Sequence, residues 1–553
     1  MGGEPMTDQR PVRVVCLGGG WTAIYLARSL KKAIERGDVQ LTIVSRDNFH
    51  TFHGFIAEML TGKVSPTNIT SPARRLFPPA RFHNAEIKSV DVDSRTVTTS
   101  RLLDGKEKVL EYDHLVVALG STDDLSRYPG IAQHALQLKT FSDNFKVRNH
   151  LLAMLEMGEI ETDPAERQRL LTFIVVGGGF GGVEVATELM DYFRRLARKE
   201  YPGIDPDEIR VLLVHSGQRI LPELAARQPK LIGYAEKMIA KGGIEVLTGT
   251  RITAATRDEA ILSDGQVIQT RSIISSSGTA LSPLLDLMPY DRDERGRMIT
   301  DEFLQVPGTD NVWAAGDCAA VPHPQGGTCP AVAIYGMYGG RQIGRNIERR
   351  IQGRPPKPFT FAGLGDACSL GRRKAVSHLK GMRFYGLPAW ILWRLFFWWF
   401  VPTWERKADI AFDWLAGPFF GRDIVGVQVA APYGLRREHY ETGQAVVRQG
   451  EVGQQIYVIT AGTADVIRET PEGEVLVTTL GPGDHFGEKS VFERTRRTAT
   501  VRATSPLEVL SLGENEARAL AETIQVFGAA VKELPNEPDV NPAPLDQPVT
   551  PAG

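Results

Sequence analysis

The sequence predicts an α/β protein made of two Rossmann-like domains, a segment of amphipathic helices and a C-terminal β jelly roll. Twice, a short apolar run leads into a glycine-rich turn and a helical pattern, first after residues 12–17 and again after residues 173–176. Beyond residue 432 the pattern changes to short strand-like runs separated by recurrent glycines, which is typical of an antiparallel barrel or jelly roll.

The composition excludes several classes of protein. The 553 residues carry 64 Lys and Arg against 66 Asp and Glu, which argues against a dedicated nucleic-acid binder. No secretory signal is visible, and the longest apolar run, residues 387–401, is shorter than the ~20 residues of a membrane-spanning helix. The cysteines form no Cys-x-x-Cys pair, so we expect buried reduced thiols in a cytoplasmic protein and no metal site or dithiol centre: Cys16, Cys318, Cys329 and Cys368.

The first glycine turn runs from Gly18 to Ala23, between the strand at residues 12–17 and a helical pattern at residues 24–34. Gly18 permits a tight turn, and Gly20 lets a pyrophosphate approach the backbone at the helix N-terminus. The strand–turn–helix context therefore predicts a dinucleotide site.

The ribose end of this site departs from the usual pattern. The next strand, residues 41–44, ends in Ser45, Arg46 and Asp47, where an acid normally holds the adenosine ribose. A serine hydroxyl binds a ribose less strongly than a carboxylate does, and Asp47 is an alternative. We expect a weakened site.

The second glycine turn follows the strand at residues 173–176 and fills all three positions of the fingerprint: Gly177, Gly179 and Gly182. Two fingerprints in one chain imply two dinucleotides, FAD at the first and a nicotinamide nucleotide at the second.

The expected ribose acid is missing here too. The strand at residues 211–214 is followed by His215, and Arg219 lies four residues further on. This pair suits a 2′-phosphate and so NADPH. Alternatively, His215 is a solvated loop residue and NADH binds less tightly.

Two further elements support a flavin. The run at residues 115–120, which ends in Gly120, resembles the strand that closes the FAD domain of flavoproteins with two dinucleotide sites. Residues 311–317 resemble the late element in which an aspartate, here Asp317 after Gly316, meets the flavin ribityl chain. Because this element follows the second fingerprint, we expect the FAD domain to be split by the NAD(P) domain.

The expected domain order follows from these motifs. It comprises the first segment of the FAD domain (residues 11–165), the NAD(P) domain (166–290), the second segment of the FAD domain (291–355), a membrane-association or dimerisation segment (356–428), a C-terminal β unit (429–533) and a proline-rich tail (534–553).

Tryptophan use is concentrated in one segment. Six of the eight tryptophans fall within residues 390–414, and residues 372–407 hold eight Lys or Arg against one acid, Glu405. Aromatic rings flanked by bases suit the headgroup boundary of a membrane. A dimer interface rich in aromatics is the alternative, and the two uses are compatible. The residues expected at the membrane are Trp390, Trp393, Arg394, Trp398 and Trp399.

Residues 11–425 resemble the type II NADH dehydrogenase family. The matching stretches are residues 41–50, the second fingerprint with Glu184, residues 315–317 and residues 369–376. The resemblance implies a monotopic, non-proton-pumping flavoenzyme at the cytoplasmic face of the cell membrane that passes electrons from NADH through FAD to a quinone. It also implies a homodimer, and places Glu184 near the stacked nicotinamide and flavin.

One departure from the family concerns the quinone site. The family carries an Ala-Gln-x-x-x-Gln motif on the helix after the Gly-Asp element, whereas residues 330–338 place Ile334 and Tyr338 at the two glutamine positions. The acceptor is therefore a different quinone or a soluble oxidant.

The C-terminal unit resembles a cyclic-nucleotide-binding domain. A short helix beginning near Gly487 offers amide groups to an anion, Arg497 suits a phosphate, and Glu488 suits a ribose 2′-hydroxyl. By the same resemblance, Thr498 is the residue type often linked to cGMP rather than cAMP. The alternative is a barrel that has lost its ligand and serves in docking. A helical pattern at residues 514–532 is expected to close the unit.

Three hypotheses follow from these motifs. The leading one is a membrane-attached NAD(P)H dehydrogenase that reduces a quinone and is gated by a cyclic nucleotide. The second is a catalytically impaired sensor of redox state or cyclic nucleotide, since both ribose acids and both quinone-site amides are absent. The third is an NAD(P)H diaphorase with a soluble acceptor.

Overall fold

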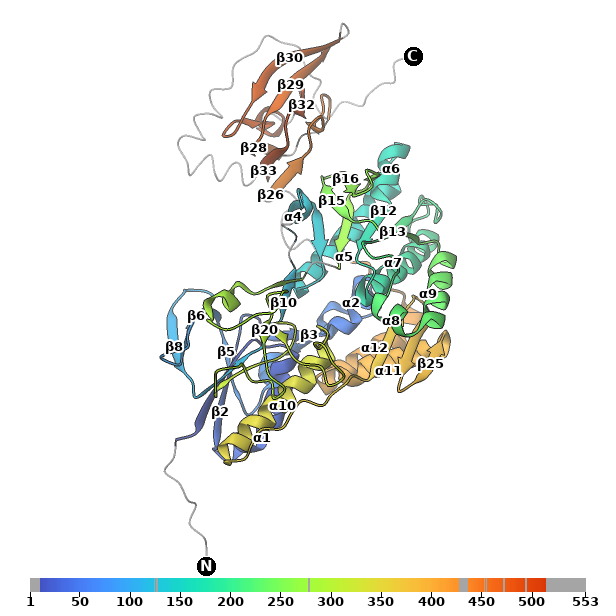
Figure 1. Ribbon diagram of the computed structural model, residues 1–553. Helices are drawn as coiled ribbons and strands as arrows, with labels where there is room; N and C mark the ends of the chain where they lie inside the picture. Colours follow the sequence, from blue (N-terminus) through green and yellow to red (C-terminus); the bar gives the residue numbers. More distant parts are fainter. Residues whose placement is uncertain are drawn as a thin grey trace, which may run out of the picture.

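The computed structural model describes residues 10–513 except 124, 126–127, 277–278, 427–435, 452, 454, 471–472 and 493–494. The expected helix at residues 514–532 and the tail at 534–553 lie outside the described residues. The predicted α/β class is confirmed (Figure 1).

The first parallel sheet joins segments from both ends of the dehydrogenase portion. Its order is β21 (Val312–Ala314), β9 (His114–Val117), β1 (Val12–Leu17), β2 (Val39–Ser45) and β5 (Arg81–Asn84). All four pairings are parallel. Because β21 comes after the second glycine turn in the chain, this sheet is completed only after the second domain has been inserted.

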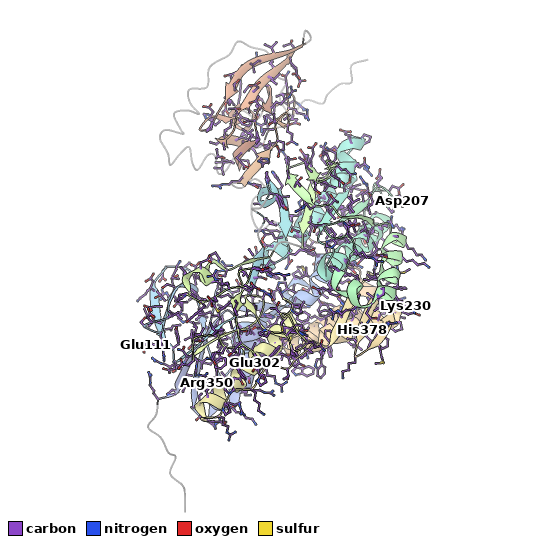
Figure 2. The ribbon with its side chains drawn as sticks, viewed as in Figure 1. Glu111, Asp207, Lys230, Glu302, Arg350 and His378 are labelled. Carbon is purple, nitrogen blue, oxygen red and sulfur yellow. The ribbon has the colours of Figure 1, made fainter. Side chains whose placement is uncertain are left out.

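Two helices pack together beside this sheet, α1 (Trp21–Glu35) and α10 (Ala333–Ile351) (Figure 1). A Cβ on Gly340 would lie 2.1 Å from the carbonyl oxygen of Thr22, so the two backbones touch. Arg350 of α10, labelled in Figure 2, lies over Trp313 of β21, and the guanidinium carbon is 5.5 Å from the ring centre.

The second parallel sheet has the order β11 (Ala135–Gln137), β18 (Ser272–Ser275), β12 (Thr172–Val176), β13 (Arg210–His215) and β14 (Glu245–Thr248). Its central strands are almost fully buried, as expected of a sheet covered on both faces. The main helices around it are α5 (Phe141–Ile160), α7 (Phe180–Lys199) and α9 (Pro229–Lys241).

Three smaller antiparallel sheets extend these domains. They are β6 (Glu86–Asp91), β7 (Thr96–Ser100) and β8 (Glu107–Glu111); β15 (Ile252–Ala255), β16 (Glu259–Leu262) and β17 (Val267–Gln269); and β23 (Gly365–Ser369), β24 (Ala375–Leu379) and β25 (Met382–Tyr385).

Short elements connect the larger ones. The helices are α2 (Ile56–Leu60), α3 (Ala73–Leu76), α4 (Ile131–His134), α6 (Pro164–Leu170) and α8 (Pro222–Arg227), with 3-10 turns at His53–Phe55, Pro66–Ile69 and Pro283–Leu287. The strands are β3 (Phe49–Thr51), β4 (Thr70–Pro72), β10 (Ser121–Asp123), β19 (Thr279–Leu281), β20 (Met298–Ile299) and β22 (Ala319–Ala320).

The tryptophan-rich segment forms two helices, α11 (Leu387–Phe400) and α12 (Trp404–Phe420). Pro388 lies in the first turn of α11, and Pro402 lies between the two helices. Among the described residues, no helix combines the length and the apolar character needed to cross a bilayer.

The C-terminal unit consists of two four-stranded antiparallel sheets. One has the order β26 (Arg436–Tyr440), β33 (Leu507–Gly513), β28 (Gln455–Ala461) and β31 (His485–Phe486); the other has β27 (Ala445–Val447), β32 (Thr500–Ala503), β29 (Ala464–Thr470) and β30 (Gly473–Leu480). The short helix α13 (Glu488–Phe492) follows β31 where it was expected.

Candidate functional site

The first glycine turn forms an open cradle at the carboxyl ends of β1 and β9. Gly18 has φ +109°, and a Cβ on it would lie 2.2 Å from the carbonyl oxygen of Ala118, so only glycine fits there. Gly20 caps α1 without a side-chain hydrogen bond, and no other atom lies within 4 Å of its Cβ position. Ala23 packs in the core behind the turn. The helix N-terminus and the space at Gly20 fit a pyrophosphate.

At the ribose end, Ser45 lies next to the turn. A Cβ on Gly19 would lie 2.8 Å from Oγ of Ser45, whereas the side chains of Arg46 and Asp47 are exposed. Asn84, which sequence reasoning missed, donates from Nδ2 to the carbonyl oxygens of Ser45 (3.1 Å) and Arg46 (2.7 Å). The hydroxyl group of Ser45 thus lies beside the turn, and Asn84 holds the end of the strand that carries it.

The late Gly-Asp element meets the end of β9, as the split domain requires. Oδ2 of Asp317 accepts a 2.9 Å hydrogen bond from Oγ of Ser121, which in turn accepts one of 2.9 Å from Nζ of Lys139. Gly120 precedes this serine, and Gly316 precedes the aspartate. Ser121 and Lys139 fix the carboxylate that the sequence indicated as a flavin contact.

The four cysteines are buried thiols of low reactivity. All four are free and buried. Burial raises the pKa of the Cys318 and Cys329 thiols to about 11, so both stay protonated at neutral pH.

The second glycine turn repeats the geometry of the first. A Cβ on Gly182 would lie 1.8 Å from the carbonyl oxygen of Gly177, so the helix packs directly on the turn. Gly179 caps α7 without a side-chain bond, and the Cβ positions of Gly179 and Gly181 face open space. This turn also fits a pyrophosphate.

His215 folds back onto this turn. Its Nδ1 accepts a 3.2 Å hydrogen bond from the backbone N–H of Gly178. Burial lowers the pKa of the imidazole, which keeps it neutral, so its proton sits on Nε2. That Nε2 is buried: a Cβ on Gly217 would lie 2.6 Å from it, and a hydrogen bond to the backbone of Arg219 partly opposes the lowering of the pKa. The side chain of Arg219 is exposed and pairs with Glu236 at 3.5 Å.

Glu184 lies one turn into α7 and is held by two distant segments. Its Oε1 accepts hydrogen bonds from Nε1 of Trp393 (2.8 Å) and from the backbone N–H of Ser369 (3.0 Å). Although solvent reaches some of the residue, protein surrounds its carboxyl group, and this desolvation raises its pKa to about 8. At neutral pH the group is therefore a protonated acid.

The prediction that Trp393 and Arg394 face a membrane is wrong. Trp393 is 2% exposed because its indole reaches Glu184. Arg394 donates to Glu58 Oε1 at 2.6 Å and lies between the rings of Trp390 (4.1 Å) and Trp414 (4.4 Å). A buried carboxylate on α2, which sequence reasoning missed, draws the guanidinium inward.

The other tryptophans of that set differ among themselves. Trp398 donates from Nε1 to the carbonyl oxygen of Lys407 at 2.8 Å and is half-buried, whereas Trp399 is 68% exposed.

The predicted quinone-side residues lie in the first two turns of α10. Tyr338 stacks on Phe361 with ring centres 3.8 Å apart and planes at 11°, and Ile334 is partly exposed. The neighbouring Tyr335 hydroxyl meets Nε2 of His323 at 3.1 Å. An isoleucine and a stacked tyrosine thus occupy the two positions assigned to the amides.

In the barrel, Arg497 is buried and bound to protein. Its guanidinium donates to the carbonyl oxygens of Gly487 (2.8 Å) and Gln455 (2.7 Å) and to Oγ of Ser490 (2.6 Å). Oε2 of Glu488 is buried without a partner among the described residues. Thr498 is exposed.

A cavity of about 1170 Å³ lies between the barrel and the second Rossmann-like domain, lined by residues of both, among them Arg497 and Arg257. Nε2 of His134 accepts from the N–H of His439 at 3.0 Å, and Gln444 donates to Glu259 at 2.6 Å. The barrel is thus docked on the dehydrogenase by polar contacts.

Comparisons with known proteins agree with this geometry. Residues 12–337 match the family model of pyridine nucleotide-disulphide oxidoreductases, and residues 437–523 match that of the cyclic nucleotide-binding domain. Demethylphylloquinone reductase NdbB of Synechocystis is 30% identical over 424 residues, 75% of this chain and 98% of that protein. Type II NADH:quinone oxidoreductase NdhA of Mycobacterium tuberculosis is 29% identical over 428 residues, 74% and 88% of the two chains. The solved NDH2 of Plasmodium falciparum in complex with RYL-552 shares the fold, with a TM-score of 0.69 at 17% identity over 75% of this chain and 100% of that one.

The cofactors are FAD and a nicotinamide nucleotide, NADH or NADPH, one for each glycine turn. The chain therefore belongs to the pyridine nucleotide-disulphide oxidoreductase family, within it to the type II NADH dehydrogenases, and it carries a cyclic nucleotide-binding domain behind its dehydrogenase portion.

Proposed function

We propose that this enzyme oxidises NADH or NADPH through FAD, reduces a quinone at a membrane surface, and changes its turnover when its barrel binds a cyclic nucleotide. One observation carries the redox activity: two open glycine turns lie on two parallel sheets of the same chain, with the protonated Glu184 held near the second. When bound, FAD supplies the acceptance of a hydride and the onward transfer of two electrons.

The protein's own groups bind and orient the nicotinamide nucleotide. The N-terminus of α7 at Gly179 receives the pyrophosphate. His215 lies against this turn and is neutral, which supports NADH more than NADPH because a neutral imidazole adds no charge for a 2′-phosphate. Glu184 accepts both of its hydrogen bonds at Oε1, so its Oε2 carries the proton and serves as a donor near the nicotinamide.

A quinone is the proposed acceptor. The names of two similar proteins, demethylphylloquinone reductase and NADH:quinone oxidoreductase, support this class. The stacked pair of Tyr338 and Phe361 offers an aromatic wall to a quinone ring without the amides of the family motif.

The proposed membrane contact is the outer surface of α11 and α12, at the cytoplasmic face of the cell membrane. Exposed apolar side chains of this size and number are unusual on the surface of a soluble protein. They are Leu387, Ile391, Leu395, Trp399, Trp404, Phe412, Leu415, Phe419 and Phe420. The same surface suits a homodimer, which size-exclusion chromatography with and without detergent tests.

The proposed nucleotide site lies in the barrel, where Glu488 supplies the ribose contact and Arg497 the phosphate contact. Of these two residues, Arg497 lines the cavity between the barrel and the second Rossmann-like domain. The unpartnered Oε2 of Glu488 supports the ribose contact. Arg497 now donates to neutral acceptors, the carbonyl oxygens of Gly487 and Gln455. A bound phosphate would replace them with an anionic acceptor, which forms stronger hydrogen bonds with a guanidinium group. Because Arg257 of the dehydrogenase portion lines the same cavity, a ligand there contacts both units.

The test is a flavin titration. The purified protein should show a flavin spectrum that bleaches with NADH, more weakly with NADPH, and recovers when a quinone is added. Saturating cAMP or cGMP should change the steady-state rate. Colourless protein, or a flavin that neither donor reduces, would favour an impaired sensor, and recovery with soluble quinones but no binding to liposomes would favour a diaphorase. Equal kinetics with and without either nucleotide would reject gating.

A further inference from the structure

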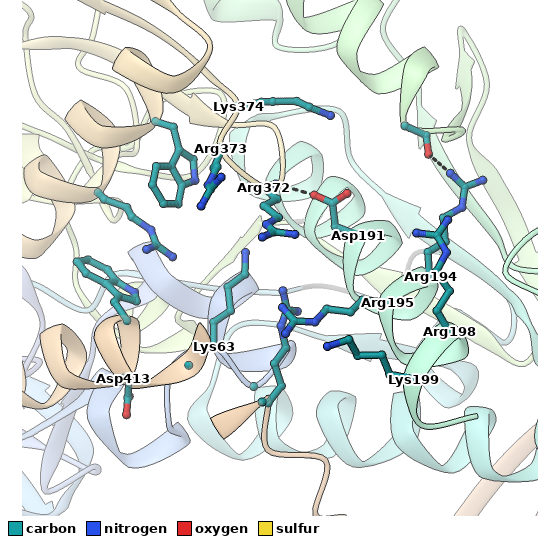
Figure 3. Close-up of a pocket in the computed structure, with 18 of the residues that line it drawn as sticks. Lys63, Asp191, Arg194, Arg195, Arg198, Lys199, Arg372, Arg373, Lys374 and Asp413 are labelled. Atoms are coloured by element: carbon teal, nitrogen blue, oxygen red, sulfur yellow. Dashed lines mark hydrogen bonds between the residues drawn. The ribbon is translucent and has the colours of Figure 1, made fainter. Parts of the chain in front are cut away.

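A second cavity, of about 870 Å³, lies between α7, the turn joining β23 to β24, and helices α11 and α12 (Figure 3). Eleven Lys and Arg residues line it against two Asp. In Figure 3 the side chains of Lys63, Arg195, Arg372 and Arg373 converge on its centre from three separate segments. A concave surface of one charge sign concentrates counter-ions.

Helix α7 supplies one basic wall. Asp191, Arg194, Arg195 and Arg198 follow the spacing of a single helix face, and Lys199 extends it. Like charges three or four residues apart on a helix repel one another. The helix dipole favours cations in the last turn, which accounts for Arg198 and Lys199 but not for the bases that face them from other elements.

The facing wall is a strained turn. Arg373 adopts φ +58°, a left-handed conformation that is unfavourable for a residue other than glycine. Oδ2 of Asp191 accepts a 2.6 Å hydrogen bond from the backbone N–H of Arg372 (Figure 3), and a Cβ on Gly371 would lie 2.4 Å from the same oxygen. The turn is therefore clamped onto α7 with its bases presented to the cavity.

Some of this charge is already paired. Lys63 contacts Glu188 at 2.5 Å, and Arg394 pairs with Glu58. In contrast, the side chains of Arg195, Arg198 and Arg373 have no ion pair or hydrogen bond among the described residues, nor does the guanidinium of Arg372. An excess of unpaired guanidinium groups suits phosphate oxygens, which bind arginine in a bidentate manner.

The cavity is separate from the nicotinamide site. Its α7 residues begin eleven positions after the first residue of that helix, about 16 Å along the axis at ~1.5 Å per residue. It also borders the apolar surface defined above, because Trp390 and Trp414 line it from α11 and α12.

We propose that this cavity binds an anion carrying several phosphate charges. Its position beside the apolar surface of α11 and α12 points to the headgroup of an anionic phospholipid, an assignment that rests on the membrane contact proposed above. A soluble polyphosphate has the same chemistry and is the second source.

The test compares the full-length protein with the double variant Arg195→Glu/Arg373→Glu. The matched control is Lys106→Glu/Lys108→Glu, which reverses two exposed charges at β8, far from α11 and α12 in Figure 1. Both variants must keep the flavin spectrum and its bleaching by NADH. One arm measures co-sedimentation with vesicles of phosphatidylcholine alone and with added phosphatidylglycerol. The other measures the melting temperature with and without inorganic pyrophosphate.

We expect phosphatidylglycerol to increase the vesicle binding of the unaltered protein and of the control. In the pocket variant this increase should be at least about tenfold smaller. Pyrophosphate should raise the melting temperature of the first two proteins only. Stabilisation by pyrophosphate without a headgroup preference identifies a soluble anion. If the unaltered protein binds no vesicles, the membrane contact fails and the pyrophosphate arm alone decides the pocket. If the pocket variant matches the control in both arms, the proposal is overturned.

Discussion

Nε1 of Trp393, on α11, donates a 2.8 Å hydrogen bond to Oε1 of Glu184, on α7. This contact joins the helix pair proposed to meet the membrane to the helix whose N-terminus is proposed to bind the nicotinamide nucleotide. It also holds one oxygen of a carboxyl group whose pKa is raised to about 8, mainly by desolvation.

Replacing Glu184 with Gln should remove a pH dependence of stability. The folded carboxyl group keeps its proton up to about pH 8, whereas the unfolded one releases it near pH 4.5. The free energy of unfolding of the unaltered protein should therefore fall as pH rises through this window, by at most about 1.4 kcal/mol per pH unit relative to Glu184→Gln. Urea unfolding at several pH values measures the difference. Parallel pH profiles for the two proteins would show that the group is not buried in its acid form.

Replacing Trp393 with Phe should move the pH profile of turnover. The indole hydrogen bond lowers the pKa of Glu184, so its loss should shift the alkaline limb of the rate profile upward. Phe keeps the aromatic packing against Phe55 and Phe397. Trp399→Phe, at an exposed position, is the control and should leave the profile in place. If the pH profiles of turnover are the same for Trp393→Phe and Trp399→Phe, the contact between Trp393 and Glu184 has no role in catalysis.

Local elements were predictable from the sequence because local chemistry dictates them. The turns at Gly18 and Gly177 need a left-handed backbone, and each follows an apolar strand. The contact of Glu184 with Trp393 spans 209 positions, and nothing near either residue signals the other. The prediction for Arg394 was wrong for a similar reason: its partner, Glu58, lies 336 positions away on a short helix without a motif.

Replacing His215 with Glu should strengthen NADH binding. A carboxylate at the end of β13 accepts hydrogen bonds from both ribose hydroxyls, whereas Nε2 of His215 is buried and faces the backbone of Arg219. We expect the KM for NADH to fall about tenfold and that for NADPH to rise, because a carboxylate repels the 2′-phosphate. Arg219→Ala should change neither value, since this exposed side chain pairs with Glu236. A shift of His215→Glu toward NADPH would contradict this account.

Replacing Asp317 with Ala should release the flavin. The change removes the acceptor that Ser121 and Lys139 hold in place beside the first glycine turn. We expect the variant to purify with little absorbance from flavin, while Asp310→Ala, an exposed change on the loop before β21, should stay yellow. Denaturing release followed by fluorescence measures FAD per chain. Full flavin content in Asp317→Ala would remove this residue from the site.

Replacing Arg257 with Ala should weaken cyclic nucleotide binding without touching the redox site. Its guanidinium belongs to the dehydrogenase portion but lines the same cavity as Arg497. Desolvation lowers its pKa, but nearby tyrosines and acids, including Tyr440 and Glu438, raise this pKa by more. A phosphate in this cavity meets two guanidinium groups, so loss of one should raise the Kd for cAMP or cGMP about tenfold. Turnover without nucleotide should not change, and Arg251→Ala, outside the cavity, should bind like the unaltered protein.

If Arg257→Ala binds normally but no longer responds in turnover, the guanidinium transmits the signal instead of binding the ligand. Unchanged binding and unchanged response together would show that the cavity between the two units is not the nucleotide site.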